Sequence, residues 1–234
     1  MNRNQHNSDT SACDPLDDLF ADLSPEQRAA LERRAIVSDY PAGYIFFTPE
    51  ERTQRLLFVK SGRVRLYKLS PEGRSLTLFV LEPQAIFGEA ALLGDRPHDC
   101  FAEALSDCRV GALPSDEVRE LMVRHPAVAL RMMDVIARRL RALERKLADI
   151  AFKSVPQRLA AILLGLADCG IEQDATLTPT VIRYTHQQLA EMLGSYRETV
   201  TKAVGEFREA RLIRVTEEAI VLLDVARLRA RAGA

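Results

Sequence analysis

The sequence lacks any apolar run long enough to cross a membrane. Its longest runs, Ala160 to Leu164 and Ala219 to Leu223, fall far short of the roughly 20 residues that a membrane-spanning helix needs. The polar N-terminal residues 1–14 also lack the apolar core of a signal peptide. We therefore expect a cytoplasmic protein with no membrane partner.

Cysteine is scarce, and the cysteines that are present are scattered. There is no CxxC pair and no spacing typical of zinc ligands or of a disulfide framework, so we expect no metal. In a cytoplasmic protein we expect reduced thiols without a special role. The four cysteines are Cys13, Cys100, Cys108 and Cys169.

The marks of an enzyme are missing too. No Ser-His-Asp order, metal-ligand spacing or P-loop is visible, and His98-Asp99 with Glu89 is a thin basis for catalysis. An excess of basic charge is also absent, because the net charge is −1. We expect no enzyme and no generally basic nucleic-acid-binding surface.

The segment from Ile36 to Leu113 is rich in short β-type runs separated by glycine and proline turns, which indicates a double-sheet β-roll or jelly roll. Helical segments are expected before it, at Pro15–Phe20 and, capped by Ser24, at Pro25–Arg34. Residues 87–93, which are helical in composition, interrupt the strands. The expected strands are residues 44–47, 55–60, 63–69, 75–81, 100–105 and 108–113.

A long helix is predicted from Ala127 to Phe152, with apolar residues spaced 3, 4, 3, 4 and 3. Such a narrow seam suits a two-stranded coiled coil, and therefore a homodimer. The alternative is that the seam packs against its own β-roll. The seam is Met133, Ile136, Leu140, Leu143, Leu147 and Ile150. The flanking residues expected on a solvated face are Arg138, Arg139, Arg141, Glu144, Arg145 and Lys146.

Two short helices around a glycine follow a proline break at Ser154-Val155-Pro156 and a helix to about Asp168. In the first, Thr185 and Gln188 predict a capping box, and Gly194 predicts a left-handed turn. Ser195 and Glu198 predict a second capping box. The buried faces are expected to be Leu189, Ala190, Leu193, Val200, Ala203, Val204 and Phe207.

This pattern predicts a helix-turn-helix, although any amphipathic helix pair shows similar stripes. Residues 212–215 and 219–223 around Thr216-Glu217-Glu218 predict a β-hairpin wing, followed by a helix at Val225–Arg231. Because the net charge is close to zero, DNA affinity would require a locally basic face. Its candidates are Arg183, Arg197, Lys202 and Arg208.

The string Arg197-Glu198-Thr199-Val200-Thr201-Lys202 after Gly194-Ser195-Tyr196 resembles the recognition helix of the cyclic-AMP receptor protein/FNR (CRP/FNR) family of bacterial transcription regulators. The resemblance extends over nearly the whole chain. It implies base contacts by Arg197, Glu198 and Lys202 in a TGTGA-like half-site. It also implies phosphate contacts by Thr185, His186, Tyr196 and Thr199. Since only Cys13 lies near the N-terminus, we expect no iron-sulfur cluster of the kind that the FNR branch carries.

Residues 87–93 resemble the family's phosphate-binding cassette, in which Gly88 turns the chain and Glu89 would accept a ribose hydroxyl. Both also suit a purely structural role. Where cyclic-AMP binders place an arginine on the phosphate, this chain has His98, followed by Asp99; Arg96 is a possible substitute. Leu143 and Glu144 replace the hydroxyl pair that contacts adenine. We therefore expect a regulator that does not need cyclic AMP, with a cyclic-AMP-gated activator as the alternative.

The expected organisation is an α+β fold with a disordered tail (1–13), a cyclic-nucleotide-binding-like β-roll sensor domain (14–125), a long dimerisation helix and hinge (126–153), and a winged helix-turn-helix DNA-binding domain (154–234). The expected function is a homodimeric, sequence-specific transcription regulator, an activator, on a palindromic site. Its partners would be double-stranded DNA, a second copy of itself and RNA polymerase. The loop from Cys169 to Pro179 is the candidate surface for contact with the polymerase. A ligand sensor without a DNA role is a further alternative.

Overall fold

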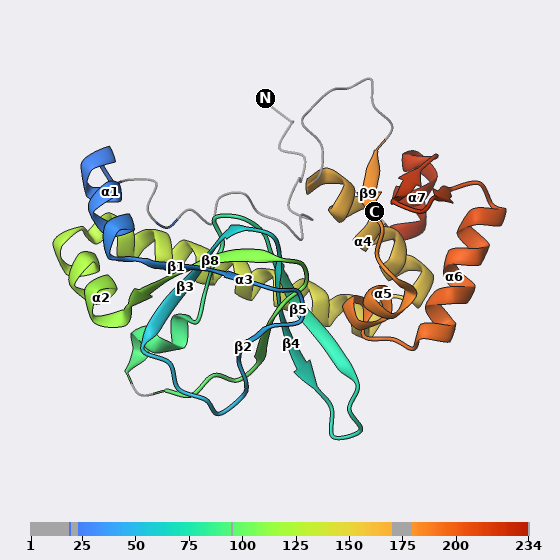
Figure 1. The fold of residues 1–234 in the computed structure, drawn as a ribbon. Helices are drawn as coiled ribbons and strands as arrows, with labels where there is room; N and C mark the ends of the chain where they lie inside the picture. Colours follow the sequence, from blue (N-terminus) through green and yellow to red (C-terminus); the bar gives the residue numbers. More distant parts are fainter. Residues whose placement is uncertain (1–18, 20–22, 95, 170–178, 234) are drawn as a thin grey trace, which may run out of the picture. The chain divides into compact units, whose positions relative to one another are not determined.

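A computed structural model describes residues 19, 23–94, 96–169 and 179–233 of the chain (Figure 1). The tail expected at 1–13, most of the helix expected at Pro15–Phe20 and most of the loop expected at 169–179 lie outside these residues. The chain divides into two compact units, one of residues 15–73 and 77–144 and one that includes residues 145–234.

The first unit is a double-sheet β-roll, as the turn spacing predicts (Figure 1). One sheet has the order β1-β8-β3-β6 and the other the order β2-β7-β4-β5. Both β1 and β6 are additions to the expected strands, and the helix expected at 87–93 is a short 3-10 helix, η1 (Glu89–Leu93). The strands are β1 (Ile36–Tyr40), β2 (Ile45–Phe47), β3 (Arg55–Ser61), β4 (Val64–Leu69), β5 (Ser75–Leu81), β6 (Ile86–Phe87), β7 (Phe101–Ala104) and β8 (Cys108–Pro114).

The strands alternate side chains between a shared core and the outer surface. Phe47, Val64, Phe87 and Ala102 are among the residues buried between the two sheets. A second cluster lies where helices cover the roll, and it includes Leu56, Ile86, Leu113, Val118, Val128, Met132 and Val135. These helices are α1 (Pro25–Arg34), α2 (Ser115–Arg124), which no sequence pattern above predicts, and α3 (Pro126–Phe152).

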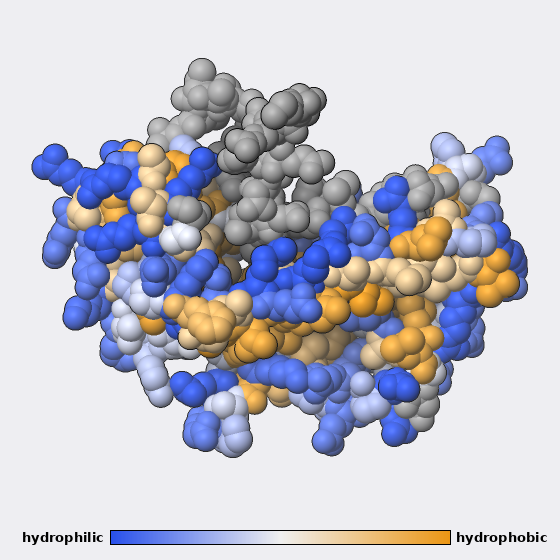
Figure 2. Space-filling model, turned by 180° about the vertical axis from the view of Figure 1, so that it is seen from behind, coloured by the Kyte–Doolittle hydropathy of each residue, from blue (hydrophilic) through white to orange (hydrophobic). Residues whose placement is uncertain are grey.

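The helix α3 has two apolar faces rather than one. Val128, Met132 and Val135 are buried in the core of the β-roll unit. The predicted seam lies elsewhere on the helix: Met133 is 66% exposed, Leu140 57% and Leu147 69%. Ile136 and Ile150 are also exposed and Leu143 is half-buried. The alternative that the seam packs against its own β-roll is therefore wrong. Figure 2 shows the resulting band of apolar residues over α3.

The second unit contains the two short helices α5 (His186–Leu193) and α6 (Arg197–Glu209). They pack with α4 (Val155–Cys169) around buried side chains that include Leu159, Leu189 and Phe207. The hairpin β10 (Ile213–Val215) and β11 (Ala219–Leu222) forms the predicted wing, and β9 (Thr180–Ile182) pairs with β11 as an unpredicted third strand. The helix α7 (Val225–Ala232) packs on α4. Among the described residues, no helix is both long and apolar enough to cross a membrane.

Candidate nucleic-acid interface and ligand pocket

The turn between α5 and α6 follows from local side-chain chemistry. The Gln188 backbone N–H donates to Thr185 Oγ1 at 3.1 Å, and the Thr185 N–H donates to Gln188 Oε1 at 2.8 Å. This is the predicted capping box. Gly194 ends α5 in the left-handed region with φ 60°, where glycine has no Cβ to clash, so the chain turns directly into α6.

The predicted cap of α6 is wrong. The helix begins at Arg197 with Tyr196 as its N-cap residue, and the cap has no side-chain hydrogen bond. Ser195 therefore lies one position too early, and Glu198 falls at the second helical position instead of the third, where a capping-box partner would stand. As a consequence, the Glu198 carboxylate is not used to close its own helix. It lies in the first turn of α6, exposed to solvent.

One face of α6 is buried and the other is polar and exposed. Val200, Ala203, Val204 and Phe207 are each at most 3% exposed, as predicted. The three expected base-contact residues, Arg197, Glu198 and Lys202, all lie on the exposed face, as do Tyr196 and Thr199. The expected contacts thus share one surface at the start of α6.

Thr185 and His186 lie at the start of α5, next to this surface. Thr185 is exposed, and the half-buried His186 has its Nδ1 atom 2.9 Å from Thr201 Oγ1. That hydroxyl in turn donates to the Arg197 carbonyl at 2.9 Å. His186 therefore ties α5 to the first turn of α6, a role that the sequence does not reveal, because the two partners lie 15 positions apart.

A groove of about 710 Å³ separates the wing from the helix pair, and it carries charges of both signs. Arg197, His186 and Arg183 line it together with Glu217 and Glu218 of the wing turn. The Arg183 guanidinium donates to the Glu217 carbonyl at 3.1 Å, which holds the turn at the start of α5. Since the wing turn carries Glu217 and Glu218, it repels phosphate.

In the β-roll unit, the turn into η1 is fixed by a glycine and two arginines. Gly88 is buried with φ 77°, and a Cβ there would lie 3.3 Å from the Arg55 carbonyl oxygen. The Arg119 guanidinium of α2 donates to the carbonyl oxygens of Ala91 at 2.8 Å and Leu92 at 3.0 Å. The end of η1 is therefore tied to α2.

The second arginine, Arg139, was expected on the solvated face of α3, and this expectation is wrong. Its side chain is 13% exposed, Nη2 donates to the Ile86 carbonyl at 2.5 Å, and Nη1 lies 3.6 Å from Glu89 Oε2. The spacing in the sequence indicates this position: Arg139 follows the buried Met132 and Val135 by seven and four residues, and therefore lies on the same face of the helix.

The remaining members of the expected solvated face divide between exposed and partly covered positions. Arg141, Glu144 and Arg145 are exposed, as expected. Arg138 has a side chain only 20% exposed, and burial lowers the pKa of Lys146 to about 8. The expectation of full solvation is therefore wrong for Arg138 and Lys146 too.

His98 is a core residue in this structure. The residue is 6% exposed; its ring stacks on Phe47 with centroids 3.7 Å apart and places Nε2 2.8 Å from Thr53 Oγ1. Burial lowers the pKa of His98, opposed in part by Glu89 and Glu51, so the ring favours its neutral form. The next residue, Asp99, is exposed and forms an ion pair with Lys68 at 2.8 Å.

These residues do not fit a cyclic phosphate. A neutral, stacked His98 supplies no permanent positive charge, Asp99 is an anion, and Arg96 is exposed. Leu143 and Glu144 lie one turn after Arg139 on α3, and Leu143 is half-buried while Glu144 is exposed. Leu143 has no hydroxyl for a purine, and Glu89 already lies beside the Arg139 cation.

The two units match two family models. Residues 37–125 match the model of the cyclic nucleotide-binding domain, and residues 157–231 match that of the Crp-like helix-turn-helix domain. The first match covers the β-roll with η1, and the second covers α5, α6 and the wing.

Curated relatives and solved structures match over most of their length. The chain is 30% identical over 214 residues to the CRP-like cAMP-activated global transcriptional regulator of Mycobacterium tuberculosis, covering 92% of this chain and 96% of the relative. It is 36% identical over 177 residues to the transcriptional regulator SdrP of Thermus thermophilus, covering 76% and 82%. The crystal structure of a CRP/FNR-family transcriptional regulator of Thermus thermophilus superimposes with a TM-score of 0.68 at 31% identity, covering 85% of this chain and 99% of that one.

Proposed function

The chain belongs to the CRP/FNR family of transcription regulators, with a helix-turn-helix DNA-binding domain, and we propose that it binds a palindromic, TGTGA-like site as a homodimer. In this proposal residues 14–125 form the sensor domain, 126–153 the dimerisation helix and hinge, and 154–234 the DNA-binding domain. The exposed polar face of α6 carries the proposal, because it gathers Arg197, Glu198 and Lys202 on one surface.

Each of these residues suits a particular base contact. The Arg197 guanidinium can donate two hydrogen bonds to a guanine, and the Glu198 carboxylate can accept one from a cytosine amine. Lys202, about one turn later, reaches a further base edge or phosphate. Thr185, His186, Tyr196 and Thr199 are proposed to contact phosphates around the same half-site.

The exposed seam of α3 supports the homodimer. A row of apolar side chains on the solvent face of one helix is buried when two copies pair along that helix. A twofold dimer presents two copies of α6 to successive major grooves, about 34–36 Å apart, which is the geometry of a palindromic site. We propose that the bound dimer activates transcription by RNA polymerase.

We further propose that DNA binding does not require cyclic AMP. The buried His98 ring, whose pKa is lowered by burial, the Arg139 cation beside Glu89 and the apolar Leu143 support this. The alternative is a cyclic-AMP-gated activator, which the name of the Mycobacterium tuberculosis relative favours. Titration of a palindromic duplex with and without cyclic AMP separates the two. We expect less than a tenfold change in affinity; a much larger change would support the gated alternative.

The DNA-reading role is tested with Arg197→Ala on a palindromic TGTGA duplex and on random DNA of equal length. We expect a loss of roughly 1–3 kcal/mol per lost contact on the palindrome and little on random DNA, because base contacts carry the specificity. Arg229→Ala, at an exposed position of α7, is the matched control for lost charge.

Equal losses on both DNAs would reduce Arg197 to a phosphate contact. Failure of the wild-type protein to select any sequence from a random DNA pool would support the further alternative, a ligand sensor without a DNA role.

A further inference from the structure

The junction between α3 and α4 is a two-residue break that the sequence makes obligatory. The first helix ends at Phe152 and the second begins at Val155, which leaves Lys153 and Ser154 between them. In a continuous helix, the Pro156 ring would clash with the carbonyl four positions earlier, that of Phe152, and Pro156 has no N–H to donate to it. The two helices therefore meet at an angle that other contacts must fix.

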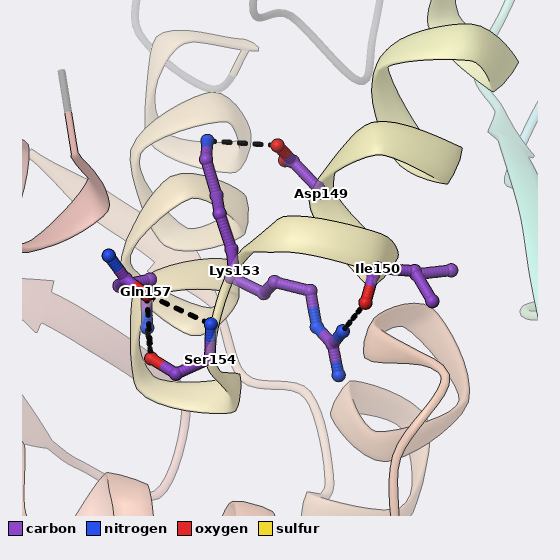
Figure 3. Close-up of polar contacts among 6 residues, drawn as sticks. Asp149, Ile150, Lys153, Ser154 and Gln157 are labelled. Atoms are coloured by element: carbon purple, nitrogen blue, oxygen red, sulfur yellow. Dashed lines mark hydrogen bonds and ion pairs between the residues drawn. The ribbon is translucent and has the colours of Figure 1, made fainter.

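Two of the contacts at the junction are local (Figure 3). The Ser154 N–H and hydroxyl both donate to Gln157 Oε1 at 2.9 Å, which caps the start of α4. The ammonium of Lys153, the first residue after α3, lies 2.9 Å from Asp149 Oδ1 in the last turn of that helix. Each contact spans three or four residues, so each stabilises one helix end without joining the two helices.

The third contact crosses the break. The Arg158 guanidinium, on the first turn of α4, donates through Nη1 to the Ile150 carbonyl oxygen at 3.1 Å. Ile150 lies among the last four residues of α3, whose carbonyls have no partner within the helix, and a cation is favourable at that negative end. Arg158 Nε is buried and, among the described residues, has no hydrogen-bond partner. The side chain is thus held at the break although one donor is unsatisfied.

We propose that Arg158 is a positioning residue that sets the half-site spacing the dimer accepts. This rests on the proposed palindrome-binding homodimer. Ile150 is the last residue of the seam; its side chain is partly exposed and also lies close to Gly194, while its carbonyl accepts from Arg158 of α4. Arg158 therefore links the dimer contact directly to the first helix of the DNA-binding domain. Without it, one of the contacts that hold the angle between α4 and α3 is lost, and the distance between the two α6 helices in the dimer becomes more variable.

The test measures spacing preference, which a general loss of stability would not change. Palindromes with the optimal spacing, and with one base pair more or fewer, are titrated with the wild-type chain and with Arg158→Met, which keeps a long stem but no donor. We expect the wild-type protein to prefer its optimal spacing at least tenfold and Arg158→Met to prefer it less than threefold, with affinity for a single half-site unchanged. Lys153→Met is the matched control, since it removes a contact that does not cross the break, and it should keep the wild-type preference.

If Arg158→Met does not fold, Arg158→Gln, which retains one donor group at shorter reach, takes its place. A folded, dimeric Arg158 variant with the wild-type spacing preference would overturn the inference and leave the proposed function standing. A wild-type protein that does not distinguish palindromic from random DNA would instead refute the proposed function, and the inference with it.

Discussion

Replacement of Leu140 by alanine tests the dimer seam with a magnitude that follows from the structure. The Leu140 side chain is 57% exposed in the single chain. Complete burial of a leucine contributes about 1.5–3 kcal/mol, so covering the exposed part contributes about 1–1.5 kcal/mol per protomer. In a twofold dimer the change occurs twice, so Leu140→Ala should weaken association by about 2–3 kcal/mol, or roughly 30- to 150-fold in dissociation constant.

The assay is sedimentation equilibrium over a dilution series at constant salt. Leu93→Ala is the matched control, because Leu93 is also a largely exposed leucine, at 68%, but it lies at the end of η1 and off the seam. This control should leave the dimer dissociation constant unchanged. A folded Leu140→Ala protein that dimerises as tightly as the wild type would refute the argument that the exposed face of α3 is the interface.

Further predictions concern two glycines, the reactivity of Cys100 and the titration of His98. Gly205→Ala should raise the free energy of unfolding, measured in urea, by about 1 kcal/mol, because a Cβ at this helical position meets no atom within 4 Å. Gly111→Ala should instead lower the free energy of unfolding, because its Cβ would lie 2.1 Å from Phe58 Cζ. Burial, together with the charges of Glu89 and Asp99, raises the pKa of Cys100 to about 11. At pH 8, alkylation of Cys100 should therefore be about a hundredfold slower in the native than in the unfolded chain, as measured by peptide mass spectrometry. Equal alkylation rates would contradict this. Burial lowers the pKa of His98 below 6.5, so the unfolded state binds the proton at a higher pH and the free energy of unfolding should fall as the pH drops below about 6.5. In urea titrations at several pH values, His98→Asn should lose this part of the pH dependence. An unchanged pH dependence would exclude a contribution from His98.

Local patterns predict the DNA-binding domain well because their partners are close in sequence. Thr185 and Gln188 stand three residues apart, and Gly194 follows the last apolar residue of α5. The capping box and the left-handed turn can therefore be predicted from residues that are close in the sequence. The predicted N-cap of α6 is wrong by one residue: the structure has Tyr196 at the cap where Ser195 was expected. Shifts of one residue at helix ends are common. Short strands such as β9 are visible only through their pairing with β11.

The surroundings of Glu89 and His98 were less predictable, because their contacts join distant parts of the chain. Arg139 meets a carboxylate 50 positions earlier, at Glu89, and His98 bonds to Thr53 across 45 positions. The sequence indicates that His98 replaces an arginine, but only the structure shows its ring stacked in the core. Cys100 and Cys108 are free thiols, Cys13 lies outside the described residues, and Cys169 is described by its backbone alone. The expectation of no special role stays a prediction for all four.

The most direct test of the account is the affinity of the wild-type chain for a palindromic TGTGA duplex relative to a scrambled duplex of equal length and charge, without any cyclic nucleotide. Both dissociation constants are measured at one stated salt concentration, because phosphate contacts contribute to both. The account predicts binding to the palindrome at least about a thousandfold tighter, as is typical of specific complexes. Equal affinities for the two duplexes would contradict it.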